Sequence, residues 1–96
     1  EVKTIVILTR RADAASEALV NLAEPEATAV WQGFATGCVR AVHGLQQASG
    51  AALELETATY EEAIQFIEAL PYVAQKLLDV QYVALKPFPG FASLAG

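Results

Sequence analysis

Two residues of the sequence are candidates for proton transfer, Glu26 and His43. Glu26 falls one turn before Val30 on an expected helix, so it borders an apolar stripe and can point into a cleft against a sheet. Desolvation on such a wall would raise its pKa, as a general base acting beside a carbonyl requires. The alternative is structural, because an acid in the first turn of a helix also offsets the helix dipole.

His43 is the only histidine of the chain and falls in an expected strand, which would fix its ring. Its ordinary pKa of about 6.5 suits a proton shuttle, whereas a lone strand histidine can equally be a structural or interface residue. Arg40 lies three positions earlier, so strand alternation places the two side chains on opposite faces unless a bulge intervenes. Arg40 can hold a substrate carboxylate or pair with Glu54 or Glu56 across a hairpin.

Aromatic side chains supply the remaining candidates for substrate binding. Tyr72 follows Pro71 in an expected turn, where its hydroxyl can reach a ligand. Trp31 is a second substrate-binding candidate, although its helical spacing with Phe34 favours a core position. Cys38 has no neighbouring base and is expected to be a buried small hydrophobe. Metal-ligand spacings, phosphate loops and nucleophile elbows are missing, so we expect neither a metal nor a cofactor.

The elements that must position these residues begin with four expected strands. Their runs are rich in β-branched residues or alternate between apolar and polar side chains. They cover residues 2–9, 38–45, 51–57 and 77–85. The first strand is apolar on both alternating sets, with Ile5 and Ile7 in one and Val6 and Leu8 in the other. This pattern indicates a central strand that is covered on both faces.

Two helical segments are expected between the first two strands. A short stretch over residues 17–22 has Asp13 or Ser16 as its cap. A separate helix over residues 25–36 starts at a proline, which suits a first-turn position, and ends at Gly37, a left-handed cap.

The order of elements predicts an α+β fold. Thr59 and Glu62 match a capping box that opens one more helix, which Pro71 ends. The resulting order, β-α-β-β-α-β, is typical of a ferredoxin-like sandwich, a four-stranded antiparallel sheet with two helices on one face. The other face would leave large aliphatic side chains in water. Burying apolar area stabilises by about 25 cal/mol per Å², so we expect a homodimer that pairs its sheet faces.

Composition limits the class of protein. The 96 residues predict a single domain, 1–96, with residues 86–96 as an extended C-terminal tail that cannot form a helix and docks on the partner subunit. Apolar residues make up 54% and charged residues 18%, which excludes intrinsic disorder. A net charge of −5 with scattered basic residues argues against nucleic acid and membrane partners. One cysteine and no signal-peptide layout predict a cytoplasmic protein.

Two parts of the chain resemble known families. Residues 69–74, Ala-Leu-Pro-Tyr-Val-Ala, and residues 80–88, which end in Lys-Pro-Phe, resemble the closing segment of YCII-related domains. Residues 26–40, with Gly37 and Arg40 in a Gly-x-x-Arg pattern, are similar to muconolactone isomerase-like proteins of the same dimeric α+β barrel superfamily. The resemblance covers nearly the whole chain. It implies a ferredoxin-like subunit, dimerised through its sheets, with a small-molecule cleft between sheet and helices or at the dimer seam.

The matching positions depart from both families. The histidine and the acid typical of YCII-related domains are replaced by Glu26 and Leu70, whereas muconolactone isomerase-like chains tend to have an acid near Glu26. We expect a cofactor-independent isomerase or lyase that transfers a proton on a small carbonyl or lactone compound. The alternatives are a non-catalytic dimerisation or ligand-binding module and a cofactor-free or haem-handling monooxygenase. An enzyme should have a pocket containing at least two of Glu26, Arg40, His43 and Tyr72.

Overall fold

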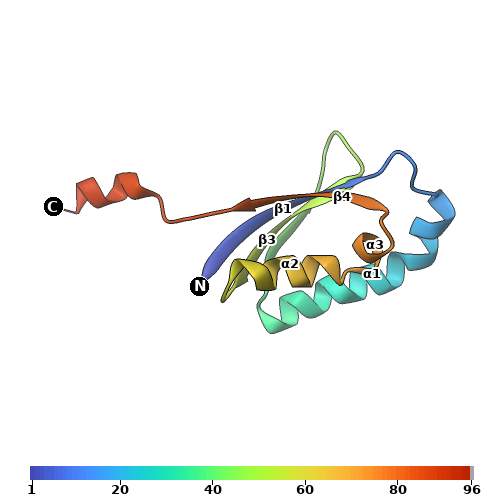
Figure 1. Cartoon of the computed structure of the whole chain (residues 1–96), viewed down its shortest axis with the longest axis horizontal. Helices are drawn as coiled ribbons and strands as arrows, with labels where there is room; N and C mark the ends of the chain where they lie inside the picture. Colours follow the sequence, from blue (N-terminus) through green and yellow to red (C-terminus); the bar gives the residue numbers. More distant parts are fainter. Residues whose placement is uncertain (96) are drawn as a thin grey trace.

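The computed structural model describes residues 1–95 and shows one sheet with helices on one side (Figure 1). The strands are β1 (Val2–Arg10), β2 (Val39–Gly44), β3 (Gly50–Thr57) and β4 (Leu78–Ala84). All pairings are antiparallel in the order β2-β3-β1-β4, so β1 is a central strand as predicted. The helices are α1 (Ser16–Thr36), α2 (Tyr60–Glu68) and α3 (Pro71–Ala74), and a 3-10 helix, η1 (Pro89–Leu94), follows. The predicted α+β ferredoxin-like fold is confirmed.

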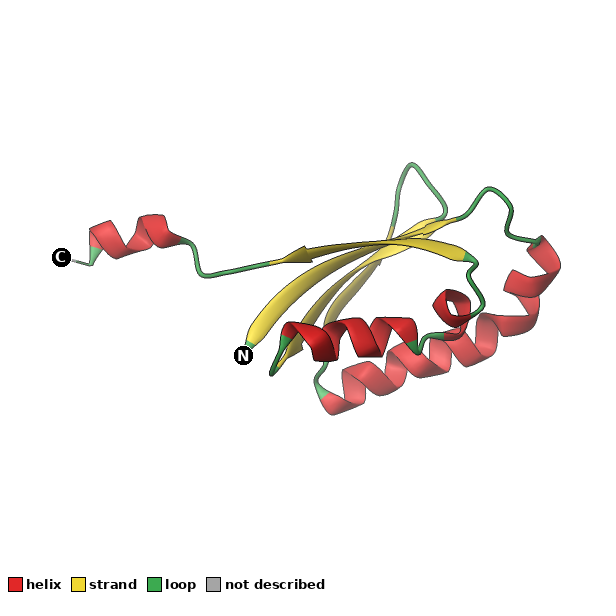
Figure 2. Cartoon of the chain, viewed as in Figure 1, coloured by secondary structure: helices red, strands yellow, loops and turns green. Residues whose placement is uncertain are grey.

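The core lies between the sheet and the helices. Figure 2 shows α1, α2 and α3 on one side of the sheet and the other side uncovered. Antiparallel pairing sets Val6 opposite Leu53, which brings the inward side chains of β1 and β3 onto the helix-facing side. The buried cluster is Val6, Leu8, Val39, Leu53, Leu55, Ala63, Ile67 and Leu70. Strand alternation therefore places Ile5 and Ile7 on the uncovered side, which we call the open face.

One continuous helix replaces the two segments expected before β2. α1 runs for 21 residues with Pro25 inside it, so the prediction of a separate helix starting at Pro25 is wrong. A proline inside a helix deprives the carbonyl four residues earlier, here that of Asn21, of its partner. Both residues are exposed, so water can hydrate that carbonyl and the helix continues. The predicted caps are not used, because Ala15 is the N-cap. Gly37 is the left-handed C-cap, as predicted, with φ at 86°.

The second helix begins as predicted. Thr59 Oγ1 accepts a hydrogen bond from the Glu62 N–H at 3.2 Å, and Glu62 Oε2 accepts one from the Ala58 N–H at 3.2 Å. The capping box is confirmed, with the returning carboxylate bound one residue earlier than the usual pattern. α2 ends at Glu68, and Pro71 opens the short helix α3 in place of the expected turn, since proline loses no hydrogen bond at the first helical position.

The C-terminal tail extends away from the sheet and helices (Figure 1). The prediction that it contains no helix is wrong, because Pro89 begins the 3-10 helix η1; Gly96 lies outside the described residues. Phe88 and Phe91 contact each other with ring centroids 4.9 Å apart. Their side chains are nevertheless 65% and 67% exposed, so the protomer itself covers little of them. No helix within residues 1–95 is long and apolar enough to cross a membrane.

We expect Gly50→Ala to lower the free energy of unfolding by about 3 kcal/mol or more. Gly50 pairs with Thr9 where β1 and β3 meet, and a Cβ there would overlap the backbone carbonyl of Leu8. Relief requires the central strands to separate, which disrupts the core. Chemical denaturation measures the loss. The control is Gly44→Ala, where an added Cβ meets no heavy atom within 4 Å. Equal stability of the two variants would contradict the close approach.

Candidate functional site

A cleft of about 370 Å³ lies between α1 and the helix-facing side of the sheet. Its apolar walls include Leu8, Leu19, Val30, Val42, Leu53 and Leu78. Four polar side chains join them, those of Arg10, Glu26, Ser49 and Tyr72. Two of the four residues proposed for an enzyme pocket, Glu26 and Tyr72, thus share one cleft. Within residues 1–95, no group of three or more His, Cys, Asp or Glu is placed to hold a metal ion.

Glu26 stands in the middle of α1 and connects that helix to α3. Its Oε1 accepts a hydrogen bond from the backbone N–H of Tyr72 at 2.9 Å. Tyr72 is the second residue of α3, whose first N–H groups have no partner inside the helix. Offsetting the dipole of its own helix is therefore not the role of Glu26, since α1 begins well before it. The carboxylate instead caps a different helix.

Burial governs the charge of the Glu26 carboxyl. Partial removal from water raises its pKa, and the hydrogen bond from Tyr72 offsets only part of that rise. Oε1 is occupied by the backbone bond, whereas Oε2 accepts no hydrogen bond from residues 1–95. A carboxylate with a raised pKa, held by one oxygen and free at the other, can accept a proton from a ligand in the cleft.

Tyr72 contributes its ring to the cleft and fixes α3 on α1. Its hydroxyl donates a hydrogen bond to the Leu19 carbonyl at 2.8 Å. Burial raises the pKa of this hydroxyl, and the nearby negative charge of Glu26 adds to the rise. The hydroxyl proton is thus already engaged, so toward a ligand Tyr72 offers an apolar ring and an acceptor oxygen.

Arg40 and His43 lie on the open face, away from the cleft. A β-bulge between Val39 and Ala41 adds one residue to β2, and Arg40 then reaches the outward-facing Glu56, with Nη1 and Oε2 3.9 Å apart. The ion pair expected for Arg40 is present, and its role in substrate binding stays a prediction. His43 is exposed and pairs with Ala52, on the same face. Because of the bulge, Arg40 and His43 share a face, and neither is brought to Glu26.

Trp31 lies outside both the core and the cleft. Its side chain is 70% exposed, so the prediction of a core position is wrong. Val30 and Phe34 pack against the core and Gly33 is buried, which turns the neighbouring Trp31 outward. It lies beside the Phe34 ring, with centroids 6.2 Å apart and the ring planes tilted by 48°. Its role in substrate binding stays a prediction.

Arg10 is the residue of the cleft that sequence reasoning missed. It continues the alternating set of Val6 and Leu8 and therefore points to the helix-facing side at the end of β1. Its Nη2 donates to the Ala14 carbonyl at 2.9 Å and to Ser16 Oγ at 3.1 Å. Counting alternate positions onward from Leu8 would have found it.

Comparison with known proteins shows the fold but no sequence family. No family model matches the chain, and no curated protein matches it. A crystal structure of muconolactone isomerase has a TM-score of 0.76 at 15% identity, and the match covers 91% of each chain. The 5-chloro-2-hydroxyhydroquinone dehydrochlorinase of Burkholderia phenoliruptrix AC1100, in complex with 2,5-dihydroxybenzoquinone, has a TM-score of 0.73 at 12% identity. That match covers 88% of this chain and 93% of the other.

These neighbours share the fold of the chain, an α+β sandwich of one antiparallel sheet and helices. More specifically, its fold is muconolactone isomerase-like, as the resemblance of residues 26–40 implied. The resemblance to YCII-related domains stays a prediction.

Proposed function

We propose that the protein is a cofactor-independent isomerase or lyase that transfers a proton on a small carbonyl or lactone compound. The observation that carries the proposal is Glu26, a half-buried carboxyl with a raised pKa on the wall of an apolar cleft. Tyr72 lies in the same cleft, so two of the candidate residues meet there.

The geometry supports a one-base mechanism. Glu26 Oε2 removes a proton from the carbon beside the carbonyl, and the electron pair of that C–H bond passes to the carbonyl oxygen as an enolate. Isomerisation follows when the same carboxyl returns the proton to a different carbon of the conjugated system. The bond from the Tyr72 N–H holds the carboxylate in one orientation, and the apolar walls keep water from quenching the enolate.

The structural neighbours support a small ring compound as the substrate. One is named for muconolactone, and the other was solved with 2,5-dihydroxybenzoquinone. Both are small oxygen-bearing ring compounds, which suit a cleft of about 370 Å³, at the small end of ligand sites.

The active form we propose is a homodimer that pairs its open faces, with the tail of each protomer on its partner. Ile5 and Ile7 lie on this face. Beside them lie Val83 of β4 and Leu85, which follows that strand; these two residues are 39% and 41% exposed. The protomer exposes 6415 Å², against about 5,300 Å² for a monomeric protein of this mass. This excess supports a partner. The sole cysteine is consistent with a cytoplasmic location.

Solvent hydrogen exchange tests the catalytic proposal. The purified protein is incubated in D₂O with muconolactone and a panel of small lactones and conjugated ketones, and deuterium incorporation is followed by ¹H NMR. We expect the wild-type protein to exchange one C–H of a panel compound faster than Glu26→Gln does. Equal exchange by both proteins across the panel would favour the non-catalytic ligand-binding module.

A further inference from the structure

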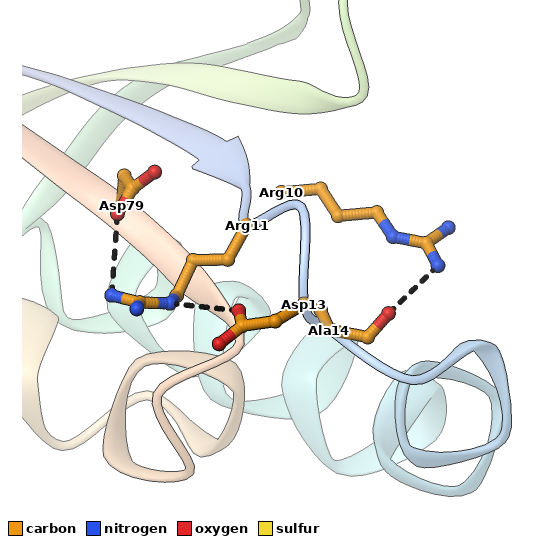
Figure 3. A network of polar contacts seen from close by, with 5 residues as sticks. All are labelled: Arg10, Arg11, Asp13, Ala14 and Asp79. Carbon is orange, nitrogen blue, oxygen red and sulfur yellow. Dashed lines mark hydrogen bonds and ion pairs between the residues drawn. The ribbon is translucent and has the colours of Figure 1, made fainter.

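Arg10 brings a positive charge to an otherwise apolar and acidic cleft. It lines the cavity together with Glu26, and no other lysine or arginine does so among residues 1–95. Its neighbour Arg11 has a different role. Figure 3 shows Arg11 between Asp13 and Asp79, while the Arg10 side chain turns the other way, toward the Ala14 carbonyl. The Arg11 guanidinium lies 3.2 Å from Asp13 Oδ1 and 3.4 Å from Asp79 Oδ1.

The guanidinium of Arg10 is held in place without an acidic partner. Nη2 donates to the Ala14 carbonyl and Ser16 Oγ, which holds the group against the start of α1. Nε and Nη1 donate to no other group of residues 1–95, and Arg10 makes no ion pair within 4.0 Å with Glu26 or with any other acid there. Arg10 is exposed, so Nε and Nη1 are hydrated and can exchange water for a ligand. Because Nη2 belongs to both bidentate edges and is already bound to the protein, each free nitrogen offers a single charge-assisted hydrogen bond to a carboxylate oxygen.

We propose that Arg10 binds the carboxylate of the substrate, so that the cleft accepts small organic acids with an apolar or conjugated body. The inference rests on the proposed function in taking this cleft as the substrate site. The aliphatic walls receive the body of the acid, Arg10 receives its charged end, and Glu26 faces the reacting carbon from α1. Inorganic phosphate lacks the apolar body that the walls would contact.

Ligand titration by NMR tests this assignment with benzoate and with its uncharged analogue benzamide. The backbone amides of Gly50 and Ala51, which line the cleft, report binding at the site. We expect benzoate to bind the wild-type protein about tenfold or more tightly than benzamide. Arg10→Gln should weaken benzoate binding by about tenfold and leave benzamide binding unchanged. Arg10→Lys keeps the charge but loses the fixed Nε–H and Nη1–H donors, and should give an intermediate benzoate affinity.

The matched control is Arg11→Gln, which removes the same charge from the adjacent position outside the cleft. It should leave the affinity for benzoate within about twofold of wild type. Equal affinities of the wild-type protein for benzoate and benzamide, or for benzoate and inorganic phosphate, would overturn the assignment. So would an equal loss in the Arg10 and Arg11 variants. Glu26→Gln should retain benzoate binding, so failure of the proton-transfer proposal and failure of the carboxylate proposal give different results.

Discussion

Glu26→Gln is expected to lower the turnover of any substrate by about 10²- to 10⁴-fold while the protein stays folded. Glutamine keeps the shape of the side chain, and its amide oxygen can accept the same hydrogen bond from the Tyr72 N–H, which spans 2.9 Å. The capping of α3 should therefore survive. The amide cannot take up a proton, so the catalytic step is lost. Turnover of the compound identified by exchange, together with the thermal midpoint, measures both effects.

The ionisation of Glu26 should also determine how catalysis and stability depend on pH. Catalysis requires the ionised carboxylate, so kcat/KM should rise with pH through the pKa of Glu26, which burial places above that of an ordinary glutamate. Between those two pKa values the folded protein binds more protons than the unfolded chain. The free energy of unfolding should therefore fall as pH rises through that window. Glu26→Gln should lack this fall, although Arg10 and Tyr72 remain on the cleft walls.

A neighbouring acid provides the control. Glu24 lies on the same helix two residues away and is exposed, so Glu24→Gln changes the net charge equally without touching the cleft. It should retain wild-type turnover and the wild-type pH profile. Full turnover by Glu26→Gln, or the same loss in both variants, would remove Glu26 from the mechanism.

Much of the fold could be predicted because its signals are local. The β-branched residues of β1, the alternation of β3 and the capping box at Thr59 each act within a few residues. Gly37 follows the same rule, because a left-handed cap needs only one residue without a Cβ. Such features depend little on what the rest of the chain does.

The site was only partly predictable because its contacts are not local. Glu26 was found from its position beside an apolar stripe, but its partner Tyr72 lies 46 residues away, and nothing in the pattern links the two. The bulge at Arg40 depends on the pairing of β2 with β3. The apolar spacing predicts a buried Trp31, but successive helix residues point about 100° apart. Val30 can therefore face the core while the next residue, Trp31, is exposed.

Ile5→Asp is expected to convert the proposed homodimer into a monomer. Ile5 lies near the centre of the open face, opposite Glu54 on β3 and Val83 on β4. In the isolated protomer it is only half-buried, so an aspartate there can stay hydrated. In the dimer the same carboxylate would lose its water beside Glu54, a like charge directly opposite on β3, which costs several kcal/mol, about the free energy available from such an interface.

Light scattering coupled to size-exclusion chromatography measures the change, and circular dichroism checks the fold. Val20→Asp is the matched control, since Val20 is 74% exposed on α1, on the other side of the molecule, and should leave the dimer intact. Val83→Asp, on the edge strand β4, repeats the test where a charge disturbs folding less than in the central strand. Dimers in both open-face variants, or a monomeric wild type, would contradict pairing through the open face, because a two-fold interface places each substituted residue in the contact twice.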